Sequence, residues 1–173
     1  MKITLCTIGF AGKTAEEFFR LLTEAGVQKV MDVRENRGGQ LSGFAKHPDL
    51  MFFLERVGRI AYAPEPLLAP SPEIRKAYRA TRDWTQYEPA FLALMRERNI
   101  PASLDAQAFA GTVALLCSEA GPERCHRRLV AELCAEYWRA QGHTVEIRHL
   151  RCPAAKETKR RNKSHADDRA DSE

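Results

Sequence analysis

Apolar residues along this chain alternate between short continuous runs and segments with helical spacing. Lys2 to Ile8 is a β-rich run ending in Gly9, and Val27 to Val33 is a second one. Between them, Thr14-Ala15-Glu16-Glu17 predicts a capping box at a helix start, and Gly26 suits the left-handed position after the last turn. Two strands separated by a helix are therefore predicted at the start of the chain.

The same alternation continues to about residue 150. Thr112 to Cys117 is a continuous apolar run, typical of a strand buried on both faces of a parallel sheet. The pattern also predicts helices at 47–58, 73–81, 88–98, 103–109 and 125–141, strands at 59–63 and 144–150, and irregular structure at 35–46 and 64–72. Strands separated by helices imply parallel βαβ units. We therefore expect one α/β domain with an open, mostly parallel, Rossmann-like sheet of about four or five strands and helices on both faces.

Charge changes this picture only at the end of the chain. Residues 156–163 carry five basic residues and one acidic residue, a net charge of +4 that equals the charge of the whole 173-residue chain. Residues 1–152 are thus expected to form the α/β domain, and 153–173 a charged, disordered tail. The basic cluster is of a kind that can contact nucleic acid, but a solvated end is the alternative because no aromatic residue lies within it.

Several classes of protein are disfavoured by the sequence. No apolar run approaches the roughly 20 residues that span a bilayer, and the first residues lack the pattern of a secretory signal. Five cysteines, an odd number without regular spacing, predict reduced thiols rather than a disulfide framework. We expect a cytoplasmic protein without a membrane partner.

Chemically distinctive residues follow the predicted strands. Gly9 follows the first strand, Asp32 and Arg34 end the second, and Cys117 and Glu119 follow the buried one. Ligands of open parallel sheets bind at the carboxyl ends of the strands. The sequence therefore predicts an acid, a guanidinium, a thiol and a second acid along one edge of the sheet.

The densest group of such residues runs from Cys117 to Arg127. A helix start near Cys125 offers free backbone N–H groups, which with Arg127 predict an anion site and a lowered pKa for Cys125. Cys117, at the end of an apolar run, is expected to be the slower thiol. Glu119 is interpreted as a partner of an arginine or as a general base. The alternative is structural, with a core cysteine, a salt-bridged glutamate and a solvated arginine pair.

Metal and cofactor motifs are not recognisable. The spacing Cys-x7-Cys-His fits no familiar zinc pattern and lacks a fourth ligand. The glycines after Arg34 follow neither the dinucleotide nor the P-loop spacing. No cofactor and no metal site are predicted from these patterns. Four aromatic residues could stack on a base or simply pack in the domain: Tyr62, Tyr78, Trp84 and Tyr87.

The order of the motifs resembles one known family. The motifs are Thr7-Ile8-Gly9-Phe10, Asp32-Val33-Arg34, Gly43-Phe44, Leu50, Tyr62, Leu115-Leu116-Cys117-Ser118-Glu119 and Cys125-His126-Arg127. Over about residues 2–150 the chain is similar to the "domain of unknown function 488" (DUF488) family, which implies an α/β fold and a site at these motifs without naming a reaction. The chain differs from the family at two places. Phe10-Ala11 stand where the family usually has His and a small hydroxyl residue, and residues 35–39 replace a segment that commonly carries Pro and Ser-Arg.

Three interpretations of function follow. The first is a hydrolase or transferase acting on a phosphate-bearing nucleotide or nucleic acid component, with Asp32 or Glu119 as general base and His126 as acid or orienting group. The second is a non-catalytic module that binds nucleic acid or a nucleotide. The third is thiol- or metal-dependent activity of the cluster formed by Cys117 and Cys125-His126. The residues predicted to bind the ligand are Gly9, Arg34, Cys117, Cys125 and Arg127.

Overall fold

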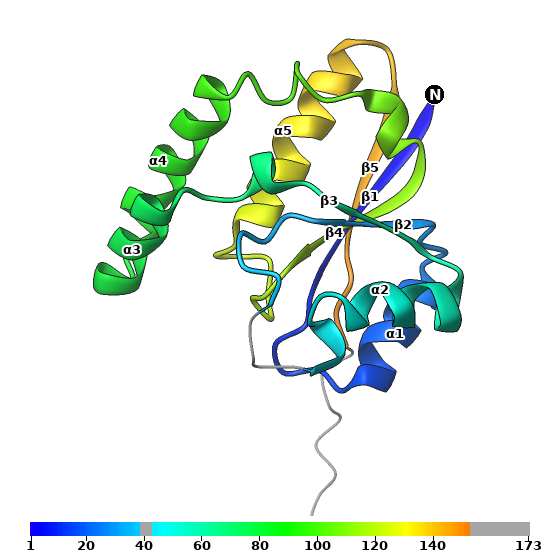
Figure 1. Cartoon of the computed structure of the whole chain (residues 1–173). Coiled ribbons are helices and arrows are strands. Elements are labelled where there is room, and N and C mark those ends of the chain that lie inside the picture. The colour runs from blue at the N-terminus through cyan, green and yellow to red at the C-terminus, as the bar shows by residue number, and fades with distance from the viewer. Residues whose placement is uncertain (39–42, 153–173) are drawn as a thin grey trace, which may run out of the picture.

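A parallel sheet lies at the centre of the structure, a computed structural model that describes residues 1–38 and 43–152 (Figure 1). Within these residues the sheet has five strands in the order β3-β2-β4-β1-β5, and every neighbouring pair is parallel. The strands are β1 (Lys2–Gly9), β2 (Lys29–Asp32), β3 (Ala61–Pro64), β4 (Gly111–Cys117) and β5 (Thr144–His149). The expected single α/β domain with an open parallel sheet is confirmed. The predicted tail, 153–173, lies outside the described residues.

Helices cover both faces of the sheet. The helices are α1 (Ala15–Glu24), α2 (Asp49–Phe53, continued by a π-helical turn Leu54–Gly58), α3 (Pro72–Thr81), α4 (Trp84–Glu97) and α5 (His126–Ala140). One core cluster joins the sheet to α1 and α2, and the other joins it to α4 and α5. In Figure 1, α3 and α4 stand at the side of the molecule, beyond α5.

The alternation of side chains along the strands decides which face each residue serves. In β4, Val113 and Leu115 pack in the core of α4 and α5, whereas Ala114 and Leu116 pack in the core of α1 and α2. Cys117 continues the odd-numbered series and therefore points toward the α4–α5 side. By the same alternation at the end of β2, Met31 and Val33 pack in the core of α4 and α5, whereas Asp32 and Arg34 point toward the side of α1 and α2.

Most helices and strands begin and end close to the bounds predicted from local sequence signals. The predicted capping box is present, because the Thr14 hydroxyl accepts from the Glu17 N–H at 3.2 Å and the Glu17 carboxylate accepts from the Thr14 N–H at 2.8 Å. The helix predicted at 88–98 begins earlier, at Trp84, because Asp83 caps it by accepting from the Thr85 N–H. The prediction of a helix at 103–109 is wrong, since only a 3-10 turn forms there, at 106–109.

The sheet order places a crevice at the carboxyl end of β4. This strand lies between β1 and β2, and its following helix, α5, packs on the face opposite to α1 and α2. Loops that leave neighbouring strands toward opposite faces open a gap where ligands bind in sheets of this kind.

No helix among the described residues is both long and apolar enough to cross a bilayer.

Candidate active site

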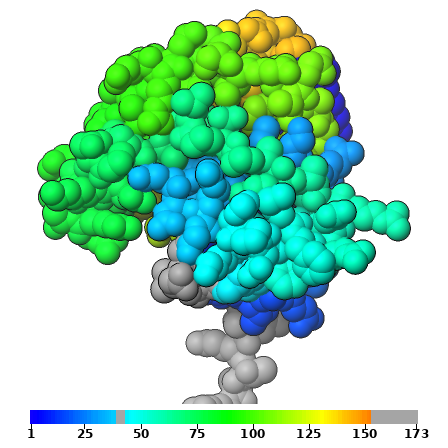
Figure 2. All heavy atoms as spheres, in the orientation of Figure 1, coloured from blue at the N-terminus to red at the C-terminus, as the bar shows by residue number. Residues whose placement is uncertain are grey.

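A cavity of about 600 Å³ opens at this crevice. Its floor comes from the ends of β1, β2 and β4 and from the start of α5, and its outer wall comes from α3 and α4. Figure 2 shows α3 and α4 (green) as a lobe beside the residues that follow β2 (light blue). Another hollow, of about 700 Å³, lies between α1 and the π-helical turn, but its lining is mostly apolar and includes none of the predicted site residues.

The lining of the cavity is rich in arginine and aromatic side chains. Five arginines and two glutamates contribute to it, together with four aromatic rings. These residues are Arg34, Arg75, Arg79, Arg82 and Arg124; Glu35 and Glu119; and Phe10, Tyr78, Trp84 and Tyr87. The cavity therefore presents excess positive charge beside flat ring surfaces.

Three of the arginines keep their guanidinium groups available. Within the described residues, the side chains of Arg79, Arg82 and Arg124 are exposed and make no hydrogen bond or ion pair. Arg75 is paired with Glu35 at 2.8 Å. Arg75 and Arg79 follow the i, i+4 spacing of one helix face, and Arg82 is the left-handed residue that caps the end of α3. This spacing is the sequence signal that could have drawn attention to these arginines.

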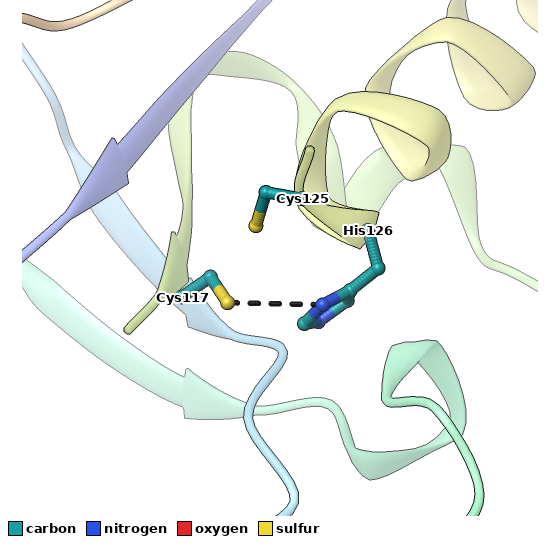
Figure 3. A group of neighbouring side chains, drawn as sticks. All are labelled: Cys117, Cys125 and His126. Carbon is teal, nitrogen blue, oxygen red and sulfur yellow. Dashed lines mark hydrogen bonds between the residues drawn. The ribbon is translucent and has the colours of Figure 1, made fainter. Parts of the chain in front are cut away.

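A thiol and an imidazole face each other on the floor of the cavity. Figure 3 shows Cys117 at the end of β4, with its sulfur directed at His126 in the first turn of α5. The distance from Cys117 Sγ to His126 Nδ1 is 3.7 Å, and the other ring nitrogen, Nε2, lies 2.9 Å from the carbonyl oxygen of Val33. A carbonyl only accepts, so Nε2 carries a proton. Nδ1 then accepts from the Cys117 thiol when the ring is neutral, and donates to the Cys117 thiolate when the ring is protonated.

The surroundings of Cys117 favour its thiolate. A hydrogen bond from the Cys125 thiol lowers the pKa of Cys117 most, and the His126 ring and the Glu119 backbone N–H add to this, which together outweigh burial. Burial alone would lower the pKa of His126, but the charge of Cys117 and the hydrogen bonds to Cys117 and Val33 raise it. The pair can therefore exchange a proton within the cavity.

The other thiol behaves differently from the sequence prediction. Burial raises the pKa of Cys125 well above its ordinary value, and the neighbouring Cys117 adds to the shift, despite the Arg127 guanidinium 3.2 Å away. The expectation of a lowered pKa at Cys125 is therefore wrong, whereas the expected slow reaction of Cys117 stays a prediction. Cys117, rather than Cys125, receives the converging hydrogen-bond donors.

Asp32 and Arg34 form an ion pair behind the wall of the cavity. Asp32 Oδ1 and Oδ2 each lie 2.7 Å from a nitrogen of Arg34, and the Tyr62 hydroxyl donates to Oδ2 at 2.8 Å. The third Arg34 nitrogen, Nη1, donates to the carbonyl oxygen of Ala45. Asp32 does not line the cavity; Arg34 does, but each of its three side-chain nitrogens already donates to Asp32 or Ala45. The pair is buried rather than solvated.

Arg127 and Gly9 hold the loop between β4 and α5. Arg127 is 1% exposed, and its guanidinium donates to the carbonyl oxygens of Glu119 at 2.7 Å and Ala120 at 3.3 Å. A Cβ atom at Gly9 would collide with the Glu119 carbonyl oxygen and lie 3.0 Å from Nη1 of Arg127. Neither residue lines the cavity, so both contribute to its shape from behind.

The structure thus divides the predicted site residues into two groups. Those that line the cavity are Arg34, Cys117, Glu119, Cys125 and His126; those that lie behind it are Gly9, Asp32 and Arg127. Within the described residues, one group of side chains has the composition and spacing to hold a metal ion, namely Cys117, Cys125 and His126, whose ligand atoms lie within 4.8 Å of one another. The arrangement therefore combines an arginine-rich wall with a floor of two thiols and an imidazole.

Comparison with known proteins identifies a family. No curated protein and no solved structure matches the chain. The sequence profile described as "Domain of unknown function DUF488" matches residues 14–134, a span that includes α1, the Asp32–Arg34 pair, the wall helices α3 and α4, and the Cys117, Cys125 and His126 cluster. The chain, over more than half of its length, therefore belongs to the DUF488 family.

Proposed function

We propose that this protein is an enzyme that acts on a phosphate-bearing nucleotide or nucleic acid component bound in the cavity at the carboxyl end of β4. The observation that carries the proposal is a set of arginines, Arg79, Arg82 and Arg124, that line this cavity and have no partner among the residues that the structure describes. Guanidinium groups bind phosphate oxygens through two parallel hydrogen bonds, which makes arginine well suited to such ligands.

Aromatic rings beside the arginines support a ligand that also contains a base. Tyr78, Trp84 and Tyr87 line the cavity, with 4.9 Å between the ring centroids of Trp84 and Tyr87 and an angle of 26° between their planes. Tyr87 is buried against this group, whereas Trp84 is half-buried and keeps part of its surface exposed. A base can extend such a stack because every base has an aromatic face.

Glu119 is the residue we assign to proton transfer. Of the two carboxylates that line the cavity, Glu35 is engaged by Arg75, whereas the Glu119 side chain makes no hydrogen bond or ion pair within the described residues. In a hydrolytic or group-transfer step, Glu119 would take the proton from the attacking hydroxyl group while the arginines stabilise the negative charge of the phosphate. Asp32 is not assigned this role because both of its oxygens are held by Arg34 and Tyr62.

Binding and turnover can be tested separately. Full-length protein would be titrated with nucleotides and a fluorescent single-stranded oligonucleotide, and the same panel would be incubated and examined by mass spectrometry. We expect the double variant Arg79→Ala/Arg82→Ala to weaken binding at least tenfold. Arg96→Ala is the matched control, because it removes an exposed arginine of α4 that does not line the cavity.

Turnover decides between an enzyme and a binding module. We expect Glu119→Gln to abolish product formation while the dissociation constant changes less than tenfold, about 1.4 kcal/mol. Tight binding without product from any member of the panel would indicate the non-catalytic module instead. Equal weakening by Arg96→Ala and by the double variant would show that the cavity is not the binding site.

A further inference from the structure

We propose that Cys117, Cys125 and His126 form a metal site of the zinc type, with one coordination position open to the cavity. This inference goes beyond the proposed function, since it concerns an ion that the protein would bind whether or not a nucleotide is its substrate. The three residues come from two elements, the end of β4 and the first turn of α5, and Figure 3 shows their side chains turned toward one another.

The separations of the ligand atoms suit one small ion. Zinc binds sulfur at about 2.3 Å and imidazole nitrogen at about 2.0 Å in tetrahedral geometry, so ligand atoms on one ion lie roughly 3.5–3.8 Å apart. Cys117 Sγ and His126 Nδ1 are 3.7 Å apart, and the three ligand atoms lie within 4.8 Å of one another. Small rotations of the cysteine side chains are therefore enough to bring all three atoms onto one ion.

The histidine is already held in the form that a metal requires. His126 Nε2 donates to the Val33 carbonyl oxygen at 2.9 Å, which leaves the lone pair of Nδ1 facing the two sulfurs. A backbone carbonyl on the second ring nitrogen is one of the usual outer partners of a metal-binding histidine, and it fixes both tautomer and ring orientation. A histidine that merely packed in the core would have no need for this alignment with two thiols.

Hydrogen-bond donors lie against both sulfurs and can support the thiolates that metal binding requires. Arg127 Nη1 donates to Cys125 Sγ at 3.2 Å, and the Glu119 backbone N–H donates to the sulfur of Cys117. Two thiolates close together repel one another, and a divalent cation between them removes this repulsion. Two sulfurs and one imidazole nitrogen are ligands that zinc prefers.

The fourth position faces the cavity, because all three residues line it. Three protein ligands with an open position are typical of catalytic rather than structural zinc, which removes the objection that a fourth protein ligand is missing. When bound, such an ion polarises an oxygen in the open position and lowers the pKa of a bound water to about 7. The residues of this chain would hold the ion beside the arginine wall that we assign to phosphate.

Cobalt provides a direct test without substrate. Reduced, chelator-treated full-length protein would be titrated with Co²⁺ and followed by absorption. We expect saturation at one ion per chain, with sulfur-to-cobalt charge-transfer absorption and the visible bands of a tetrahedral site, and displacement of cobalt by Zn²⁺. Cys117→Ser and Cys125→Ser should each lose the charge-transfer absorption or weaken binding at least a hundredfold. Cys134→Ala is the matched control, because it removes another buried sulfur from α5.

A second measurement avoids dependence on the folding of the variants. In the wild-type protein, Zn²⁺ should slow the alkylation of Cys117 and Cys125 but leave that of Cys152, which is partly exposed, unchanged. Absence of charge-transfer absorption in the reduced wild-type protein would overturn the proposal. So would cobalt binding that persists in both serine variants, or a Cys117–Cys125 disulfide whose reduction produces no metal binding. None of these results depends on nucleotide binding, so each is distinguishable from failure of the proposed function.

Discussion

The Asp32 carboxylate and the Arg34 guanidinium, two residues apart at the end of β2, form a two-point ion pair that is almost completely buried. Asp32 is 0% exposed and Arg34 is 5% exposed, and two contacts of 2.7 Å join them. Alternation along β2 turns both side chains toward the α1–α2 side, where Arg34 also reaches the Ala45 carbonyl. The triplet that looks most like a catalytic motif therefore supports the wall of the cavity.

Removing the charge of Asp32 should destabilise the fold. Asp32→Asn leaves the Arg34 guanidinium buried without a counter-ion. Breaking a buried pair in this way lowers the free energy of unfolding by about 3–5 kcal/mol. Urea unfolding measures the loss. Tyr62→Phe is the comparison, because it removes only the hydroxyl that donates to Asp32, and it should cost about 1–3 kcal/mol. Equal, small losses in the two variants would show that the ion pair is not important for stability.

A side chain at Gly9 should disturb the loop that shapes the cavity. The added methyl group in Gly9→Ala meets the Glu119 carbonyl oxygen, a backbone atom that Arg127 holds in place. Overpacking of this kind costs about 1–3 kcal/mol. Thermal melting would report the change, with Gly43→Ala as control because nothing lies within 4 Å of a Cβ there. A fully stable Gly9→Ala protein would contradict the tight packing between β1 and the loop.

Arg127 should act on the cavity through the loop from 118 to 125. Lysine cannot reproduce the planar set of donors that Arg127 offers to Glu119, Ala120 and Cys125. In Arg127→Lys we expect faster amide hydrogen exchange in this loop and a loss of stability of about 2–5 kcal/mol, because the carbonyl oxygens lose their partners. Arg124→Lys is the control, since Arg124 is exposed and its guanidinium makes no hydrogen bond within the described residues. Unchanged exchange in Arg127→Lys would show that the loop is held by other contacts.

The thiols should differ in reactivity in chelator-treated protein. Cys117 lines the cavity and its pKa lies below the ordinary value, whereas burial raises the pKa of Cys6 to about 11 and that of Cys134 to about 12. A lowered pKa keeps the thiolate present as the pH falls, so alkylation of Cys117 by iodoacetamide should slow little between pH 8 and 6.5.

A free thiol of pKa about 8.5 would slow roughly 20-fold over the same range. Peptide mass spectrometry after timed quenching gives the rate for each cysteine. If Cys117 reacts no faster than Cys6 and Cys134 at pH 6.5, the assigned hydrogen bonds do not stabilise its thiolate.

Local sequence signals were sufficient for the order of the elements and for several of their ends. A continuous apolar run marked the buried strand Thr112 to Cys117, and the Thr14–Glu17 box and Gly26 (φ 66°) bound the first helix as predicted. These features depend on neighbours within a few residues, through capping hydrogen bonds and backbone sterics.

The partners of each site residue required the tertiary structure, because they are distant in sequence. The tautomer of His126 depends on the Val33 carbonyl, 93 residues earlier. The arginine and aromatic wall of the cavity depends on α3 and α4 folding back over the carboxyl end of β4. The sequence by itself determined the α/β alternation and placed Asp32 and Cys117 at strand ends. Only the tertiary structure decided where these side chains lie. Because β4 packs beside β2 and side chains alternate along each strand, Cys117 is part of the cavity floor and Asp32 is buried behind it.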